Sequence, residues 1–314
     1  MKSLRDALPE YLAIRRALGT QLKEAGISLR HFLDFMEAEG VEVITLQIAL
    51  RWAMLPVGVQ IATWSRRLGQ VRGFAAWRSG FDPRTEVPPE RMLGARLLRN
   101  PPHIYSDEEV QALMAGAAGL PKGRIRPWTY RTFLGLMAST GLRPGEALAL
   151  DMKDVDLQTG VLTIRGTKFG KTRFVPVSES TQAALADYAR RRESLCRRIR
   201  TEAFFLTPRG NRLRAESARQ TLAELSCAIG LRQPQMGGRR GRGPRLQDFR
   251  HTFATMRMIE WYRAGLDVSR ELPKLSTYLG HAEICHTYWY LQAIPELLQL
   301  AAGRLVGRGE EVAQ

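Results

Sequence analysis

Four side chains, widely spaced along the 314-residue chain, are of types that could act together on a phosphate. Arg143 follows Thr-Gly-Leu, Arg250 precedes His-Thr-Phe, and a Leu-Gly-His sequence ends at His281, nine residues before Tyr290. Guanidinium groups fork onto the non-bridging oxygens of a phosphate and offset the negative charge that grows during attack. A tyrosine hydroxyl, whose ordinary pKa is about 10, becomes an effective nucleophile in such cationic surroundings. These residue types predict attack on a phosphodiester, provided that the fold brings them together.

The charge of the chain points to a polyanionic partner. It has 47 lysines and arginines against 31 aspartates and glutamates, which gives a formal net charge of +16 and a sequence pI near 10.4. We expect nucleic acid first, an anionic membrane surface second and a merely soluble basic protein third. A hydrophobic content of 44% with 25% charged residues is ordinary for a folded chain and argues against global disorder.

The N-terminal residues and the cysteines bear on location. No apolar run reaches the roughly 18 residues that a membrane-spanning helix needs, and Asp6 and Glu10 lie where a secretory signal would be apolar. The three cysteines, Cys196, Cys227 and Cys285, are odd in number and form no CxxC pair. We therefore expect a cytoplasmic, nucleoid-associated protein with no membrane partner, no disulfide framework and no structural metal.

Helical periodicity dominates residues 1–82, because apolar residues recur three and four positions apart. We expect one helix to be capped by Ser28 and stopped at Gly40, another to open at Thr45, and a last one to run over about 60–77. Apolar side chains form the inward stripe of this last helix. Four arginines are expected mostly off that stripe: Arg66, Arg67, Arg72 and Arg78.

A second domain is expected over 104–314, after a proline-rich linker over 83–103 that cannot hold continuous helix. It opens with a capping box that begins at Ser106. Alternating residues predict a β-hairpin in this otherwise helical domain, with strands over 161–165 and 173–177 and a turn-rich tip between them. Helices are expected over 130–139, 144–150 and 180–200.

Together with Lys168 on the hairpin tip, the segments around Arg143, Arg250, His281 and Tyr290 resemble the tyrosine recombinase (phage integrase) family. The resemblance is specific in the second domain and weak in the first. It implies a mainly α fold with a small β-sheet, in which an α+β catalytic domain and an N-terminal helical, SAM-like core-binding domain form a C-shaped clamp on DNA. It also implies strand cleavage and rejoining that need no metal, no cofactor and no ATP.

The resemblance assigns a role to each of these residues. Arg143 and Arg250 would hold the scissile phosphate, and Tyr290 would attack it, which leaves a 3′-phosphotyrosine and a free 5′-hydroxyl. Lys168 would protonate the leaving oxygen, because an alkoxide leaves as a strong base unless a general acid reaches it. His281 would donate a hydrogen bond to the phosphate.

Neighbouring residues support or rival these assignments. Lys171 lies on the same tip as Lys168 and could substitute for it. Glu146, one helical turn past Arg143, is expected to orient the pocket rather than to transfer protons. Two tyrosines rival the nucleophile, one before the Leu-Gly-His sequence and one after it: Tyr278 and Tyr288.

One position departs from the family pattern. Gln247 stands three residues before Arg250, where the family usually has a histidine, and an amide cannot take a proton. Hydrogen bonding to the phosphate survives this replacement. We therefore expect a working enzyme whose base is water or His281, with a catalytically weakened protein as the alternative.

Contacts outside the catalytic centre are expected to be mostly with the DNA backbone. The candidates are six arginines: Arg66, Arg67, Arg239, Arg240, Arg242 and Arg245. We expect the partners to be double-stranded DNA with a specific recombination site, further copies of the chain in a dimer or tetramer, and other recombinases of the same element. The favoured function is a site-specific recombinase that acts through a Holliday junction in integration, excision or transposition of a mobile element. The alternatives are a type IB topoisomerase-like enzyme and a weakened, DNA-binding accessory recombinase.

Overall fold

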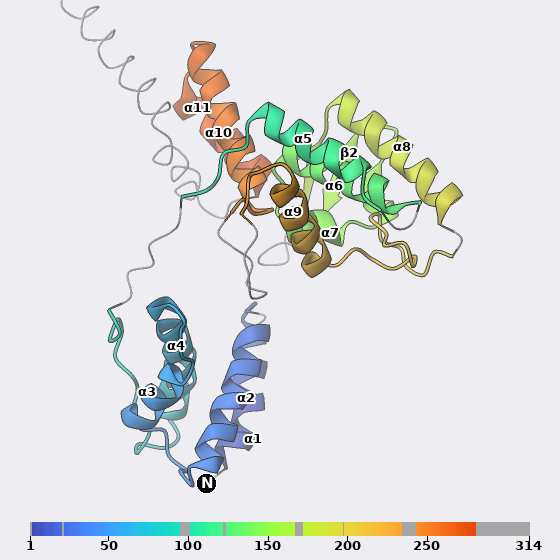
Figure 1. Ribbon diagram of the computed structural model, residues 1–314. Coiled ribbons are helices and arrows are strands. Elements are labelled where there is room, and N and C mark those ends of the chain that lie inside the picture. Colours follow the sequence, from blue (N-terminus) through green and yellow to red (C-terminus); the bar gives the residue numbers. More distant parts are fainter. Residues whose placement is uncertain are drawn as a thin grey trace, which may run out of the picture. The chain divides into compact units, whose positions relative to one another are not determined.

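The computed structural model describes residues 2–20, 22–94, 101–121, 124–166, 172–196, 198–233 and 243–280. The chain divides into two compact units, Met1–Asn100 and Pro101–Gln314 (Figure 1). Helices dominate the described part of both units, and a three-stranded sheet lies in the second. The expected fold class, mainly α with a small sheet, is confirmed.

The described part of the first unit contains four helices: α1 (Leu4–Ala17), α2 (Lys23–Ala38), α3 (Leu46–Met54) and α4 (Ile61–Arg78). Their apolar faces meet in a core whose large aromatic side chains include Phe32, Trp52 and Phe74, each at most 2% exposed. The Phe32 ring meets the Trp52 ring edge-on, with 5.1 Å between the centroids. Thr45 caps α3 as expected, because its hydroxyl accepts the Ile48 N–H at 3.3 Å.

The expected cap at Ser28 is wrong. α2 begins at Lys23, so Ser28 lies inside the helix. A Cβ on Gly26 would lie 3.3 Å from a methyl group of Leu12, which shows how closely this early turn of α2 packs on α1. Packing between the two helices therefore starts α2 five residues before Ser28, the residue that local capping favours.

Part of the segment expected as a linker is attached to the first unit. The Glu86 N–H donates to the Ile44 carbonyl at 2.9 Å, and the Glu86 carboxylate accepts the Leu46 N–H at 2.6 Å. These bonds hold the chain between Pro83 and Pro88 against the start of α3. Residues 95–100, later in the 83–103 stretch, lie outside the described residues.

The second unit is built around one central helix, α6. In the described part of this unit the helices, in chain order, are α5 (Asp107–Ala118), α6 (Arg126–Thr140), α7 (Pro144–Ala149), the 3-10 helix η1 (Met152–Asp154), α8 (Glu179–Leu195), α9 (Ala215–Ala228), α10 (Asp248–Arg263) and α11 (Val268–Leu279). α6 contacts α5, α7, α8 and α10, and its buried Phe133 and Met137 lie in the main core cluster. The helix expected to run to about residue 200 ends at Leu195, five residues earlier than predicted.

The second unit also contains an antiparallel sheet. Its strands lie in the order β1 (Val155–Asp156), β2 (Val161–Ile164) and β3 (Arg173–Pro176). β2 and β3 form the predicted hairpin, with Leu162 opposite Val175 and Ile164 opposite Arg173. Leu162, Ile164 and Val175 are each at most 2% exposed and join the main core. This register anchors the two strand ends that lead to the tip, whose residues 167–171 lie outside the described ones.

The capping box at the start of α5 is confirmed and is open to a stability test. The Ser106 hydroxyl accepts the Glu109 N–H at 3.2 Å, and the Glu109 carboxylate accepts the Ser106 N–H at 3.1 Å. Ser106→Ala is expected to lower the free energy of unfolding by about 1 kcal/mol, because a helix donor loses its partner. Urea denaturation measures this loss, with Ser194→Ala on the exposed side of α8 as control. An equal loss in both variants would contradict the capping role.

Candidate active site

Two of the predicted arginines lie against the same helix end. α11 ends in a left-handed cap at Gly280, where φ is 68°. The carbonyl of Leu279 accepts a hydrogen bond from Nη2 of Arg250 at 2.8 Å, and the carbonyl of Gly280 accepts one from Nη2 of Arg143 at 3.3 Å. The last carbonyls of a helix lack partners within it and carry partial negative charge, so cations are favoured there. Consecutive carbonyls thus bring the two arginines together, directly before His281.

Arg143 is fixed through its backbone as well as its side chain. It lies at the N-cap position of α7 with extended backbone (φ −64°, ψ 141°), as the following proline favours. Glu146, in the first turn of α7, accepts the Arg143 backbone N–H at 3.1 Å and Nη1 of its guanidinium at 2.8 Å. The Arg143 side chain remains 36% exposed. Its guanidinium is therefore oriented by the protein and still open to a ligand.

Arg250 joins three segments inside the protein. It lies in the first turn of α10, is 1% exposed, and donates through Nη1 to the carbonyl of Gly141 at 3.1 Å. Gly141 ends α6 with φ at +59°, and a Cβ there would lie 2.7 Å from the Phe253 ring. Glycine is therefore required at this turn, for its backbone conformation and for space. Through Gly141 and Leu279, Arg250 connects α10 to the ends of α6 and α11.

Glu146 is a carboxylate that lies between two arginines, with its side chain 10% exposed. Besides Arg143 it binds Arg173 of β3, whose Nη2 donates to Oε2 at 2.7 Å and whose Nη1 donates to Oε1 at 3.1 Å. Burial alone would raise the pKa of Glu146, but the hydrogen bonds and positive charge of Arg173 and Arg143 outweigh it and hold this pKa below its ordinary value. A carboxylate has about four acceptor positions, and these four bonds occupy them. Glu146 is therefore suited to orienting its neighbours.

Arg173 is a site residue that was not predicted from the sequence. Its position held a signal, because residues 173 and 175 point to the same side of the strand and Val175 is fully buried. A charged residue on the inward side of a strand needs a buried partner. Glu146 is that partner, and only the fold brings the two together.

The ion pairs of Glu146 predict a pH dependence of stability. Because its folded-state pKa is depressed, the stabilisation is fully present above the unfolded value of about 4.5 and is lost as the pH falls below it, through the folded pKa. Glu146→Gln should therefore be less stable than the wild type at pH 7, with a gap that narrows as the pH falls below about 4.5. Urea denaturation at several pH values measures the gap. Glu260→Gln, in an exposed ion pair with Arg257, is the control, and a gap of constant size at Glu146 would refute the argument.

Gln247 lies within the described residues, and the next residue, Asp248, has a structural role. Gln247 lies directly before α10, half-buried, and its side chain makes no capping hydrogen bond. Asp248, 1% exposed, accepts the Arg245 backbone N–H at 2.8 Å and its Nη2 at 2.9 Å. The Arg245 side chain is still 53% exposed.

Several predicted residues lie outside the described ones: Lys168, Lys171, Arg239, Arg240, Arg242, His281 and Tyr290.

The arginines of α4 have different surroundings. Arg66 is exposed and, with Arg72, lines a pocket of about 520 Å³. Arg67 lies over the Trp52 ring, 3.7 Å from its centroid, and donates to the Trp52 carbonyl at 2.8 Å, so it covers the core of the first unit. Burial lowers the pKa of Arg67. Arg78 is only 5% exposed, so its predicted position off the inward stripe is wrong.

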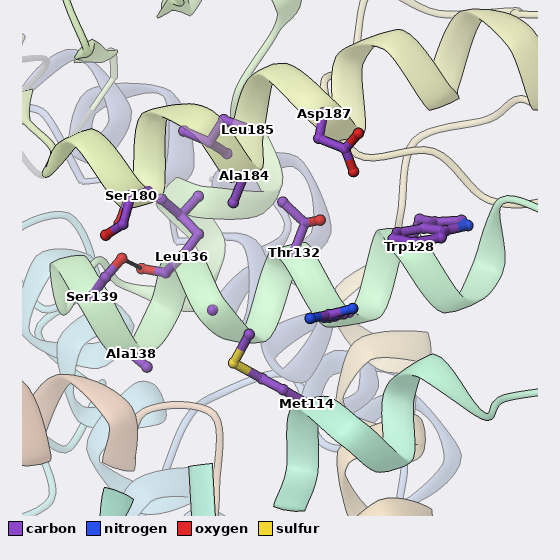
Figure 2. Close-up of a pocket in the computed structure, with 13 residues that line it drawn as sticks. Met114, Trp128, Thr132, Leu136, Ala138, Ser139, Ser180, Ala184, Leu185 and Asp187 are labelled. Carbon is purple, nitrogen blue, oxygen red and sulfur yellow. Dashed lines mark hydrogen bonds between the residues drawn. The ribbon is translucent and has the colours of Figure 1, made fainter. Parts of the chain in front are cut away.

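A separate pocket of about 570 Å³ lies between α5, α6 and α8. Figure 2 shows Met114 of α5, Leu136 of α6 and Leu185 of α8 among its mostly apolar lining, with Trp128 and Asp187 towards one end. None of the candidate catalytic residues in the described part of the chain lines it. The predicted chemistry therefore does not depend on this pocket.

The described ranges also bear on membranes and metals. No helix within them is long and apolar enough to cross a membrane. Nor do three or more histidine, cysteine, aspartate or glutamate side chains gather there in a group that could hold a metal ion. Cys196 and Cys227 carry free thiols, and Cys285 lies outside the described residues.

Comparison with known proteins defines the class to which this mainly helical fold with paired arginines belongs. The model of the phage integrase family matches residues 104–296. The putative integrase/recombinase y4rB of Sinorhizobium fredii is 44% identical over 316 residues, which covers 99% of each chain. The tyrosine recombinase XerD of Mycobacterium tuberculosis is 37% identical over 220 residues, 67% of this chain and 65% of that protein. The chain belongs to the phage integrase family of tyrosine recombinases, as its motifs predicted.

A solved structure agrees at the level of the fold. The integrase of the transposon Tn1549, in complex with transposon right end DNA, superposes with a TM-score of 0.65 at 16% identity. The match covers 92% of this chain and 94% of that one. At this identity the likeness extends to the fold alone.

Proposed function

We propose that this chain is a site-specific DNA recombinase that cleaves and rejoins duplex DNA through a 3′-phosphotyrosine on Tyr290. The observation that carries the proposal is the meeting of Arg143 and Arg250 at consecutive carbonyls of the α11 terminus. Two guanidiniums in one place are suited to one phosphate. The chain that leaves this terminus carries His281 at once and Tyr290 nine residues later.

The reaction follows from these groups. The phenolic oxygen of Tyr290 loses its proton to water or to His281 and forms a bond to phosphorus, and the bond from phosphorus to the 5′-oxygen breaks. Lys168 gives its proton to that oxygen, while Arg143, Arg250 and His281 offset the charge on the phosphoryl oxygens. Because the phosphotyrosine is itself a phosphodiester, a 5′-hydroxyl from another strand can reverse the step without ATP. Two such exchanges in sequence pass through a Holliday junction.

The partner we propose is double-stranded DNA, bound by a dimer or tetramer of the chain, with other recombinases of the same element as further partners. The excess of positive charge supports this partner: residues 1–102 hold 15 basic and 10 acidic residues, and the remainder 32 and 21. A solved structure in which a lambda integrase dimer is bound to a core site has a TM-score of 0.56. The names of the integrase relatives support a mobile element as the biological setting.

A covalent trap tests this function on DNA of many sequences at once. The purified full-length chain is incubated with a pool of nicked duplexes carrying random arms and with duplexes from DNA that flanks its gene. On a nicked duplex the short leaving strand diffuses away, so the phosphotyrosine accumulates and survives denaturation in SDS. We expect adducts that enrich one sequence on sequencing of the bound DNA. The absence of any adduct, with folding confirmed by circular dichroism, would overturn the proposal.

Gln247 favours one other function, a DNA-binding accessory recombinase that has lost chemistry. Its amide cannot act as the base that a histidine would supply. Loss of one acid–base group typically lowers a rate by about 10² to 10⁴ and does not abolish it. Sequence-specific binding without adducts would favour the accessory protein. Relaxation of any supercoiled plasmid, whatever its sequence, would instead identify a type IB topoisomerase-like enzyme.

A further inference from the structure

Arg173 lies at the start of β3 and holds two other parts of the catalytic domain. Its two Nη atoms fork onto the carboxylate of Glu146, at 2.7 and 3.1 Å. Its Nε donates to the carbonyl of Tyr278 at 3.0 Å. The side chain is 13% exposed, so solvent does not compete strongly for these bonds. One guanidinium thus connects the hairpin, α7 and the end of α11.

The end of α11 is bound by three arginines in succession. The carbonyls of residues 278, 279 and 280 accept hydrogen bonds from Arg173, Arg250 and Arg143 respectively. Glu146 binds two of these three arginines, so its negative charge lies between their positive ones. Any displacement of Arg173 would shift both Glu146 and the backbone that Arg143 contacts.

The fit around Arg173 leaves little freedom. A Cβ on Gly280 would lie 2.8 Å from Nη1 and 2.9 Å from Cζ of Arg173, so the guanidinium packs directly on the backbone before His281. A lysine ammonium is a compact point charge and cannot fork onto Glu146 while it reaches the Tyr278 carbonyl. Arginine is therefore required at position 173 for geometry as well as for charge.

We propose that Arg173 is a positioning residue of the catalytic centre, which through Glu146 and the carbonyls at the α11 terminus holds Arg143 in one arrangement. The inference rests on the proposed recombinase function. Arg173 acts on the phosphate through Arg143 and does not itself contact the reacting atoms. Misplacement of a catalytic group by about 1 Å, caused by a change away from the chemistry, can lower a rate by about 10²-fold.

The test is single-turnover cleavage of a nicked duplex recovered from the covalent trap. The amplitude of adduct formation reports the fraction of folded, competent protein, and the rate constant reports how well the site is arranged. For Arg173→Gln we expect a rate constant lower by about 10²-fold, with affinity for DNA within about threefold of the wild type. Arg173→Lys should lie between the two, because it restores the charge without the fork. A merely structural role would lower the amplitude and leave the rate constant unchanged.

A double-mutant cycle separates the positioning role from general damage. Arg173→Gln, Glu146→Gln and the double variant remove one or both members of the pair, and the double variant leaves no uncompensated carboxylate even if Arg173→Gln alone folds poorly. Members of one unit are strongly non-additive, so the double variant should cleave no more slowly than the worse single variant. Arg165→Gln is the matched control: Arg165 follows β2 beside the Arg173 pairing, is 56% exposed and binds Asp154 at 2.6 Å. It should keep the wild-type rate constant.

Two results would overturn the inference. One is a rate constant for Arg173→Gln within about threefold of the wild type. The other is a double variant whose loss equals the product of the two single losses, because that would make the residues independent. In both cases the wild type still forms adducts, so the failure differs from that of the proposed function, in which the wild type forms none.

Discussion

Tyr290→Phe is expected to form no covalent adduct with DNA under conditions in which the wild-type chain converts most of a nicked duplex. Phenylalanine keeps the ring but has no oxygen to bond to phosphorus, and removal of a covalent nucleophile lowers a rate by about 10⁶-fold in a well-studied hydrolase. Binding to DNA should change less than about twofold, because the substitution alters no charge and affinity comes mainly from contacts of basic residues with phosphates. Denaturing gels measure the adduct, and gel shifts measure the binding.

Tyr278 provides a matched control whose surroundings the structure describes. Its hydroxyl donates to the Pro176 carbonyl at 3.3 Å, and its ring stacks on Phe253 with 5.6 Å between the centroids. Burial raises the pKa of Tyr278 to about 12, so its phenolate is harder to form than that of an ordinary tyrosine. Tyr278→Phe should therefore keep the adduct, as should Tyr288→Phe. An adduct that disappears in one of these variants and persists in Tyr290→Phe would reassign the nucleophile.

The features that the sequence predicted correctly depend on neighbours in the chain. The capping box at Ser106 needs only residues three apart, and the hairpin needs only strand alternation around a turn-rich tip. The helix predicted over 130–139 was also found, and it ends at Gly141, since glycine readily adopts the left-handed conformation found there. Local signals of this kind placed Arg143 directly after a helix end, as the structure shows.

The features that the sequence did not predict depend on distant contacts. Arg173 binds Glu146, and Arg67 covers Trp52, in both cases across segments that only the fold brings together. Ser28 carries a good local capping signal, yet packing of α2 on α1 starts the helix earlier. The periodicity of apolar residues indicates which face of a helix or strand is buried, but it does not indicate which charged side chain will pair with a residue from a distant segment.

Arg250→Lys is expected to lower both catalysis and stability, because Arg250 is at once a candidate phosphate ligand and a structural connector. Lysine keeps one positive charge but cannot donate to the carbonyls of Gly141 and Leu279 with the planar fork that arginine has. Loss of one preorganised donor to developing negative charge typically lowers a rate by about 10² to 10³-fold. A buried carbonyl that loses its donor costs about 1–3 kcal/mol, so unfolding should also become easier.

The two effects can be measured separately and compared with a control on the same helix. Single-turnover cleavage gives the rate constant, and urea denaturation gives the free energy of unfolding. Arg257→Lys, two turns along α10 at a side chain that is 49% exposed and pairs with Glu260, should leave both near the wild-type values. A loss of stability in Arg250→Lys with an unchanged rate constant would assign Arg250 to the fold alone. A loss of rate with unchanged stability would show that the bonds from Arg250 to the two carbonyls contribute little to the fold. Only a combined loss of rate and stability agrees with an arginine that both connects α6, α10 and α11 and binds the phosphate.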